Sequence, residues 1–362
     1  MSLDNDFQKK YTGKGSLNNR QVDRVKAITK SLQKINCYSD KNFFIVVEGK
    51  DDIPLYSPVF TEKQCKLIPL WGVDNVKYIF KKLKTRRDQS KPMRQVLELA
   101  DNQEKINKLS RMRDENKIIG IIDLDFEKEK CSNNEYSTQD YSNLFVTETN
   151  DGQILLLSNY GLIIFIKELC DQEKVKEFKK RNKIEQLFKQ IIIMTNYSGL
   201  ARYLNKKFGK EKKDFQPLKF RILDPEDIFY NYIAWDRVLT DNDIIKLLFH
   251  EESNNDYNAD FIKEYAKKKS NLEYYFPNRW DVCQGHDMTK VLLSIHRLVG
   301  CGKNYTQEND LIDDICNIFH SPKNAFFNKT SLFTALKRWE REKFPYSESG
   351  MFSEIYSQKE VK

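Results

Sequence analysis

The stretch FFIVVEGKDD, residues 43–52, decides the fold of this chain together with IIGIIDLDFE, residues 118–127. Each begins as a short run of apolar residues and then turns abruptly to carboxylates. Wholly apolar runs of this length are typical of strands buried on both faces of a sheet. Glu48 directly follows the first run, and Asp123 and Asp125 end the second. The carboxyl ends of parallel strands lie at one edge of a sheet, so we expect these acids to converge.

The wider pattern predicts an α/β fold. Apolar strands alternate with helices, which favours a Rossmann-like parallel sheet covered on both faces. The predicted strands are residues 43–47, 66–72, 117–125 and 144–150, and the predicted helices are 52–60, 73–87 and 151–169, with 88–117 more helical than loop-like. We expect an N-terminal helical segment in residues 1–39, the α/β domain in 40–172 and a mostly helical C-terminal domain in 173–362.

Within the outer regions the prediction is coarser. Apolar residues repeat at helical spacing over 20–35, and 174–208 reads as a long helical stretch with a break near Asn196 to Gly199. Residues 218–224 form a possible further strand. The segments 286–299 and 331–342 are expected to be helices of the C-terminal domain.

Composition restricts the class of protein. The chain has 362 residues, of which 40% are hydrophobic, as in globular proteins. No apolar run reaches the length of a membrane span, and the first ten residues lack a signal-peptide core, so we expect a cytoplasmic protein without a membrane partner. Seven scattered cysteines and four histidines make a disulfide framework or a zinc site unlikely, and predict reduced, buried thiols.

Gathering carboxylates is electrostatically unfavourable. Two of them about 4 Å apart repel by about 4 kcal/mol at an effective dielectric constant of 20. Protonation or a nearby lysine such as Lys50 would offset this, and a divalent cation would do so best. Oxygen ligands without His or Cys favour Mg²⁺ or Mn²⁺. The candidate ligands end or follow predicted strands, and they are Glu48, Asp123, Asp125, Glu127 and Asp151. The alternative for any one of them is that it only caps a helix or ends a strand.

Positive charge provides a second hint. The net charge is +8, and basic residues crowd the helix that begins at residue 73. A nucleic-acid-binding face there would contain Lys77, Lys81, Lys84, Arg86 and Arg87. A merely solvated face is an equally good reading. The lysine runs in 205–213 and 267–269 are interpreted as solvated surface. His286 and Asp287 form either an acid–base pair or, more simply, a helix start capped by Asp287.

At its acidic motifs the chain resembles the Toprim family of metal-dependent domains. The hallmarks of that family are a Glu-Gly after the first strand and an Asp-x-Asp after a later one. Here they stand as VVEGKDD, with Glu48 and Gly49, and IIDLDFE, with Asp123 and Asp125. The chain is also similar to the Toprim effectors of PARIS-type anti-phage systems, through LWGVDNVKYI, TETND, YSGLARYL and CQGHDMTKVLL.

The resemblance implies a magnesium-dependent endonuclease. Asp123 and Asp125 would anchor the metal, while Glu48 would bind it or act as general base, and Lys50 would steady the scissile phosphate. Asp52, Glu127 and Asp151 would be outer or second-metal ligands. The expected substrate is nucleic acid, RNA rather than DNA and specifically transfer RNA. The expected partners are an ABC-type ATPase and a second copy of the chain.

One departure from the family and two alternative functions accompany this hypothesis. Where these relatives have an acidic residue one turn after the fourth strand, this chain has Gln153, which leaves Asp151 as the candidate ligand there. A phosphatase of the haloacid dehalogenase type also has Asp-x-Asp after an apolar strand. That family needs a small or hydroxyl residue where Glu127 stands, and VVEGKDD would be unexplained. A non-catalytic Toprim-like module that docks an ATPase is the third possibility.

Overall fold

The computed structural model describes residues 43–80, 100–124, 131–132, 134–136, 141–149, 151–180, 183–211, 259–276, 278–299, 305, 307–345 and 350–357. The described residues belong to two compact units. The first lies within 1–123, 129–146 and 328–362, and the second within 124–128 and 147–327. The predicted helix at 20–35 and the predicted strand at 218–224 lie outside the described residues.

The first unit contains a six-stranded sheet with the order β2-β1-β3-β6-β5-β4. Strands β2, β1, β3 and β6 run parallel, while β5 and β4 are antiparallel additions. The strands are β1 (Phe43–Val47), β2 (Cys65–Pro69), β3 (Ile118–Ile122), β4 (Cys131–Ser132), β5 (Glu135–Tyr136) and β6 (Leu144–Val146). The α/β class and all four predicted parallel strands are confirmed. The two-residue strands were not predicted, because so short a polar pair has no periodicity.

The central strands are buried as their composition predicts. Every residue of β1 and of β3 is buried. Phe44 pairs with Ile118 of β3, while Lys66 of β2 lies on its other side. β1 therefore has a parallel neighbour on each side and buries its aromatic and β-branched side chains on both faces of the sheet.

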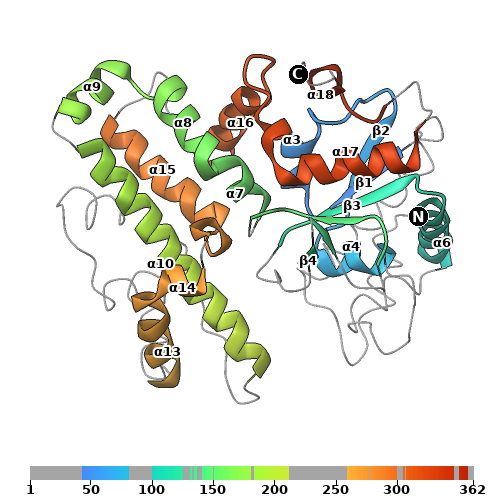
Figure 1. Ribbon diagram of the computed structural model, residues 1–362, viewed down its shortest axis with the longest axis horizontal. Helices are drawn as coiled ribbons and strands as arrows, with labels where there is room; N and C mark the ends of the chain where they lie inside the picture. Colours follow the sequence, from blue (N-terminus) through green and yellow to red (C-terminus); the bar gives the residue numbers. More distant parts are fainter. Residues whose placement is uncertain are drawn as a thin grey trace, which may run out of the picture. The chain divides into compact units, whose positions relative to one another are not determined.

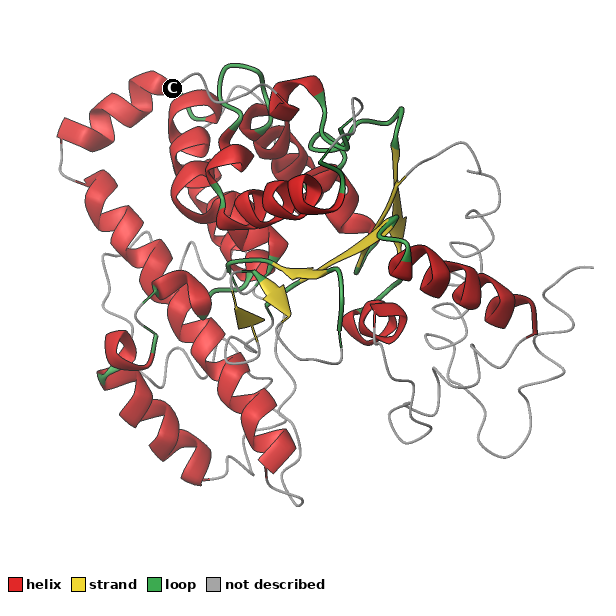
Figure 2. Ribbon diagram, turned by 45° about the vertical axis from the view of Figure 1, so that its right-hand side comes forward, coloured by secondary structure: helices red, strands yellow, loops and turns green. Residues whose placement is uncertain are grey.

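Helices cover both faces of this sheet (Figures 1 and 2). α4 (Val73–Phe80) and α6 (Ala100–Asp114) pack against β3 on one face, and α17 (Ser331–Lys343) packs against β6 on the other. Gly120 of β3 makes the approach of α4 possible, since a β-carbon there would come within 2.6 Å of the Phe80 ring. α4 and α6 confirm the helical predictions where they overlap with them.

The C-terminal helix α17 belongs to the sheet. The indole N–H of Trp339 donates to Asn143 at 3.0 Å, and its ring meets that of Phe145 edge-on at 6.3 Å. Phe344 packs edge-on against Phe43 at 4.9 Å. The sequence predicted this helix correctly but assigned it to the helical second domain. Its apolar face is complementary to the sheet, which the linear sequence does not show. The short helix α18 (Glu354–Ser357) follows it.

The second unit is helical. Its elements are α7 (Gly152–Leu156), α8 (Leu162–Ile164), α9 (Gln172–Lys180), α10 (Lys183–Glu211), α13 (Ala259–Ser270), α14 (Leu272–Tyr275), α15 (Gly285–Val299) and α16 (Glu308–Phe319), with the π-helical turns η5 (Leu157–Gly161) and η6 (Phe165–Leu169) and the 3-10 turn η9 (Arg279–Asp281). The turn η10 (Phe326–Lys329) precedes α17 along the chain. The predicted helices over 151–169 and 286–299 are confirmed.

The predicted break in the long helix is wrong. α10 runs without interruption through residues 196–199. A β-carbon on Gly199 would collide with the carbonyl oxygen of Val282. The glycine therefore allows the segment before α15 to pack closely on α10, and it does not end the helix. Glycine has this second use wherever two backbones approach each other.

The thiol prediction is confirmed for the cysteines whose state is known. Cys65, Cys170, Cys283 and Cys316 are buried thiols that take part in no disulfide. Burial raises the pKa of the Cys316 thiol to about 12, so this thiol stays protonated and unreactive at neutral pH. Among the described helices, none combines the length and apolar character needed to cross a membrane.

Candidate metal centre

The candidate site lies where the sheet order reverses. From the central strand β1 the chain moves to β2 on one side, and it later returns to form β3 on the other side. In open parallel sheets, such a switch point at the carboxyl ends of the strands is where ligands bind. Glu48 directly follows β1 and Asp123 directly follows β3. The two predicted acids therefore occupy the favoured position.

Glu48 and Asp123 are in direct contact. The backbone N–H of Asp123 donates to Oε1 of Glu48 at 2.8 Å. On its other side, the carbonyl oxygen of Glu48 accepts the N–H of Gly72 at 2.8 Å, which fixes the backbone at the end of β1. Both acidic residues are only partly buried. Hydrogen bonds from two neighbouring segments of the chain thus fix Glu48, while the residue remains partly exposed.

The loop after β1 holds a third acid. Oδ2 of Asp52 accepts the N–H of Gly49 at 2.8 Å. Asp52 occupies the N-cap position of α3 (Ile53–Tyr56), as predicted, but its side chain makes no capping bond to that helix. It folds back to close the short 3-10 turn η2 (Lys50–Asp52), in which Lys50 is exposed. Asp52 therefore shapes the turn that follows Glu48.

Gly49, which follows Glu48, has an ordinary extended backbone. Its φ of −135° and ψ of 172° are extended values that any residue adopts. The nearest atoms to a β-carbon there would be those of Asp51 and Asp52, at 3.8 Å. The backbone conformation therefore does not require glycine at this position. Close approach of a ligand is the remaining physical reason for a glycine here.

The structure describes only part of the predicted ligand set. Asp125 and Glu127 lie outside the described residues. Glu48, Asp52 and Asp123 all belong to the first unit, and Asp151 belongs to the second. Among the described residues, no three His, Cys, Asp or Glu side chains are grouped closely enough to hold a metal ion.

The residues present fit a hard divalent cation. The Glu48 carboxylate lies against the backbone of Asp123, and Mg²⁺ is commonly held by one or two carboxylates together with water and substrate phosphates. The hydrogen bond from Asp123 to Glu48 provides the kind of outer support that orients metal ligands. Asp125 is two residues further along the chain and would complete the Asp-x-Asp pair.

Two threonines that the sequence analysis did not select organise the segment after β6. Oγ1 of Thr147 accepts the N–H of Leu124 at 3.1 Å and donates to the carbonyl oxygen of Thr149 at 2.8 Å. Oγ1 of Thr149 in turn donates to the carbonyl oxygen of Asp151 at 2.9 Å. Both threonines are buried. The signal was present as two threonines at alternate positions of TETND, directly after an apolar strand.

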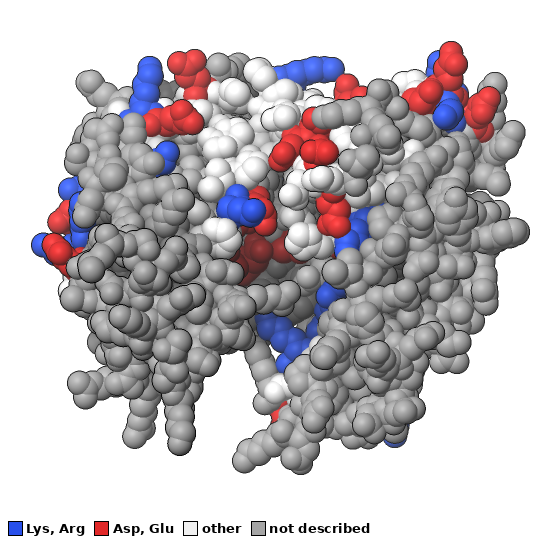
Figure 3. Space-filling model, turned by 180° about the vertical axis from the view of Figure 1, so that it is seen from behind, with Lys and Arg blue, Asp and Glu red and all other residues white. Residues whose placement is uncertain are grey.

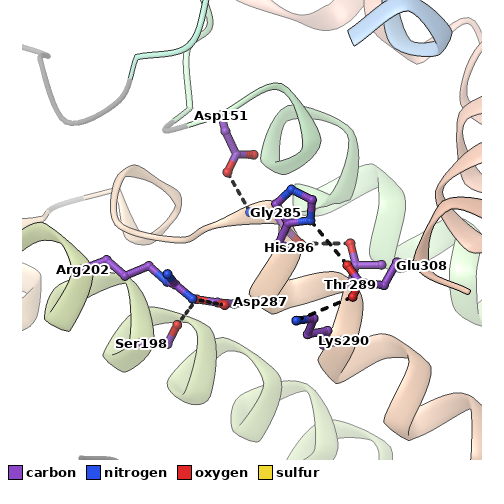
Figure 4. A network of polar contacts seen from close by, with 9 residues as sticks. All are labelled: Asp151, Ser198, Arg202, Gly285, His286, Asp287, Thr289, Lys290 and Glu308. Atoms are coloured by element: carbon purple, nitrogen blue, oxygen red, sulfur yellow. Dashed lines mark hydrogen bonds and ion pairs between the residues drawn. The ribbon is translucent and has the colours of Figure 1, made fainter. Parts of the chain in front are cut away.

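Asp151 joins the starts of two helices (Figure 4). Oδ1 accepts the N–H of Ile154 at the start of α7, and Oδ2 accepts the N–H of Gly285 at the start of α15, both at 2.7 Å. Burial raises the pKa of Asp151 to about 6, although these two hydrogen bonds act in the opposite direction. Its predicted capping of α7 is confirmed. Its role as a metal ligand stays a prediction.

His286 and Asp287 have separate partners (Figure 4). Asp287 is buried and accepts two hydrogen bonds from Arg202 of α10, at 2.9 and 2.8 Å, and a third from Ser198. His286 contacts Glu308 at 3.4 Å instead, and this contact raises the pKa of the imidazole. Neither the acid–base pair nor the simple cap is correct, because Asp287 ties α15 to α10.

The predicted basic face is mostly untested. Lys77 lies on α4, and it is partly buried. The other four members, Lys81, Lys84, Arg86 and Arg87, lie outside the described residues. Figure 3 shows basic and acidic side chains of described residues close to one another on one face of the molecule. The described charge on that face is therefore mixed in sign.

Comparisons with protein-family models and with curated proteins found no relative of this chain. No protein-family model matches the chain, and no curated protein matches it. The Toprim resemblance therefore rests on the residues quoted above, and the function that it implies is a hypothesis.

Proposed function

We propose that this chain is a divalent-metal-dependent nuclease of the Toprim type. The observation that carries the proposal is the junction of Glu48 and Asp123 at the switch point of a parallel sheet, with the Asp123 N–H on Glu48 Oε1 at 2.8 Å. Two acids from sequence-distant strands meet there without any His or Cys in the motif. This donor set suits Mg²⁺ or Mn²⁺, and such ions are suited to phosphodiester chemistry.

The roles of the chain's own groups follow from their positions. Glu48 and Asp123, with Asp125, would hold the ion, which when bound supplies positive charge to the phosphate oxygens. The Glu48 carboxylate, oriented by the Asp123 amide, is also suited to accept a proton from an attacking water or ribose hydroxyl. Lys50 is exposed in the turn after Glu48, where a point charge can contact a phosphate.

The finer parts of the proposal rest on the resemblance. We propose RNA, and in particular transfer RNA, as the substrate, and a role in anti-phage defence in the cytoplasm. An ABC-type ATPase would hold the chain inactive, and the active form would be a homodimer. The segments that resemble those of PARIS-type effectors support these points, since they extend across both units.

The test is a cleavage assay with the purified full chain. Total RNA and plasmid DNA are each incubated with Mg²⁺, Mn²⁺ or EDTA, with wild type and Glu48→Ala. We expect RNA fragments of discrete size that require the metal and disappear with the variant. Cleavage that persists in EDTA or in Glu48→Ala would disprove the proposal. If only plasmid is cut, the metal-dependent nuclease stands and the RNA assignment is wrong.

A further inference from the structure

Two helices of the second unit lie side by side and bring basic residues together. α13 packs against α10, through an edge-on contact of Phe208 with Phe261 whose ring centroids are 5.7 Å apart. The Tyr265 hydroxyl donates to the carbonyl oxygen of Tyr197 at 3.5 Å. Phe261 and Tyr265 are each only 1% exposed. Figures 1 and 2 both show the two helices adjacent. The pair is therefore fixed by a buried aromatic contact.

The outer side of α13 is basic. Lys263 and Lys267 are one helical turn apart and both exposed, so they share a face. The helix ends in three consecutive lysines, residues 267–269. Within the described residues, neither Lys263 nor Lys267 forms an ion pair with a carboxylate. A row of positive charge thus runs along the helix toward α14.

The lysine cluster extends across both helices. Lys268 is 3.7 Å from Glu264, yet burial holds its pKa below the ordinary value, and the charges of Lys207 on α10 and of Lys267 act in the same direction. Its ammonium group lies 3.5 Å from the ring centroid of Tyr275. Lysines of the two helices are therefore close enough to one another to interact electrostatically.

An exposed tyrosine stands beside this charge. Tyr274 is 81% exposed, and Ile262 at 37% is the other exposed large hydrophobic residue in the part of the chain that the structure describes. Ile262 lies on α13, and Tyr274 lies on α14. The Tyr274 ring meets the Tyr275 ring edge-on, with centroids 5.2 Å apart and planes at 85°. The Lys268 ammonium packs on the other aromatic ring, that of Tyr275. Tyr274 is therefore exposed while it contacts a ring that is fixed in place.

Stability of the fold explains the lysines only in part. Lysines in the last turn of a helix interact favourably with its carbonyl groups. That accounts for residues 267–269 but not for Tyr274, whose ring contributes little buried area. An aromatic ring left in water next to a row of lysines has the character of a single-stranded nucleic-acid site, in which bases stack on aromatic rings and phosphates contact cations.

We infer that α13 and α14 form a binding surface for single-stranded nucleic acid, with Tyr274 stacking on a base and Lys263 and Lys267 contacting phosphates. The inference deepens the proposed nuclease function by locating a substrate contact in the second unit. The lysines are complementary to any polyanion, and the exposed ring beside them favours a single strand, whose bases can stack on the ring while its phosphates contact the cations.

The experiment is fluorescence anisotropy with the full chain and a labelled, unstructured twelve-nucleotide RNA, and separately the matching DNA, in EDTA so that nothing is cleaved. We expect Tyr274→Ala to weaken binding about fivefold or more, while Tyr274→Phe binds as wild type does. Lys263→Ala with Lys267→Ala should weaken binding and reduce the slope of log affinity against log salt by about 1.4. Tyr274→Ala should leave that slope unchanged.

The matched control removes two lysines elsewhere. Lys174 and Lys176 are exposed on α9 of the same unit, next to Glu173 and Glu177. Their double alanine variant should bind RNA as wild type does. The surface is disproved if Tyr274→Ala binds normally, if the α9 variant loses as much affinity as the α13 variant, or if duplex RNA competes as well as the single strand does. It is also disproved if the wild-type chain binds neither strand.

This experiment is independent of the nuclease proposal. Loss of cleavage in Glu48→Ala together with loss of RNA affinity in Tyr274→Ala supports both proposals. If Glu48→Ala still cleaves while Tyr274→Ala loses affinity, the catalytic assignment fails and the binding surface stands. If Tyr274→Ala binds normally and Glu48→Ala does not cleave, the binding surface fails and the catalytic assignment stands. Circular dichroism checks that each variant is folded, and the exposure of Tyr274 makes a folding defect there unexpected.

Discussion

The backbone N–H of Asp123 donates to the Glu48 carboxylate at 2.8 Å and thereby joins two residues that are 75 positions apart. The bond crosses from the end of one parallel strand to the end of its neighbour. It does two things at once, since it satisfies an N–H group at the end of β3 and orients the glutamate. The candidate site is thus built into the sheet and does not depend on a flexible loop to position its main acid.

Substituting Glu48 separates its charge from its hydrogen bond. Glu48→Gln keeps an oxygen that can accept the Asp123 N–H, but it removes the negative charge. We expect cleavage to fall about 10²- to 10⁴-fold, as for loss of a general base, with little change in the free energy of unfolding. Glu48→Ala should abolish cleavage and also destabilise the chain by about 1–3 kcal/mol, because the amide loses its acceptor. Urea unfolding and the cleavage assay measure the two effects.

The control is Glu62→Gln, which removes an exposed carboxylate from the same unit. It should leave both cleavage and stability near those of wild type. Equal activity in Glu48→Gln and wild type would contradict the catalytic role of Glu48.

Gly49→Ala tests whether a ligand approaches the backbone after β1. A β-carbon fits there, with its nearest atoms at 3.8 Å, so we expect the free energy of unfolding to change by less than about 1 kcal/mol. Cleavage should nevertheless fall about tenfold or more if a phosphate or ion lies against this position. Thermal unfolding and initial cleavage rates give the two values. Full activity would show that Gly49 is not needed for ligand approach.

Asp151 should make stability depend on pH. Its folded pKa is raised to about 6, so the stability linked to its protonated form is present below pH 4 and is lost as pH rises through 6. Asp151→Asn cannot ionise. We therefore expect the stability of wild type relative to this variant to fall between pH 4 and 7, by on the order of 1 kcal/mol or more. Thermal unfolding in EDTA at several pH values measures this.

The matched control for loss of a helix cap is Asp171→Asn. Asp171 is exposed and accepts the N–H of Glu173 at 2.9 Å at the start of α9. The stability of Asp171→Asn relative to wild type at each pH gives the effect of losing an exposed helix cap. A stability of wild type relative to Asp151→Asn that rises between pH 4 and 7 would contradict the assigned direction.

Trp339 tests the attachment of the C-terminal helix to the sheet. It is 5% exposed, packs on Phe145 and donates to Asn143. Trp339→Ala should therefore lower the free energy of unfolding by about 3–5 kcal/mol. Arg338→Ala is the control on the outer side of the same helix, where the ion pair with Glu135 is exposed and contributes about 0.2–1 kcal/mol. Similar losses for the two variants, measured in urea, would contradict the packing.

The strands could be predicted because their signal is local. Residues 43–47 and 118–122 are wholly apolar, and each run is followed directly by a carboxylate residue. Such a composition implies a strand that is buried on both faces of the sheet. The predicted break in α10 failed for the opposite reason. A glycine in a helix reads as a weak point, but at Gly199 it serves a contact with Val282, which is distant in sequence. Local propensity does not contain that contact.

In the candidate site too, some features could be predicted from the sequence and others depend on contacts between distant segments. Glu48 and Asp123 were predicted because strand ends meet at an edge by the geometry of any parallel sheet. The partners of Asp287 were not predicted, since Arg202 and Ser198 lie on a helix whose placement no pattern reveals. The lysines 267–269 were interpreted as solvated surface, and only the packing of α10 against α13 brought Lys207 close to them.

The amino-acid sequence by itself determined the α/β class, the four parallel strands and the acids at their ends, because apolar periodicity and strand polarity act over a few residues. Only the tertiary structure decided that α17 covers the sheet, that Asp123 orients Glu48 and that Asp151 connects two helix starts. Those outcomes depend on shape and hydrogen-bond partners brought together from distant parts of the chain, and such complementarity exists only once the elements have packed.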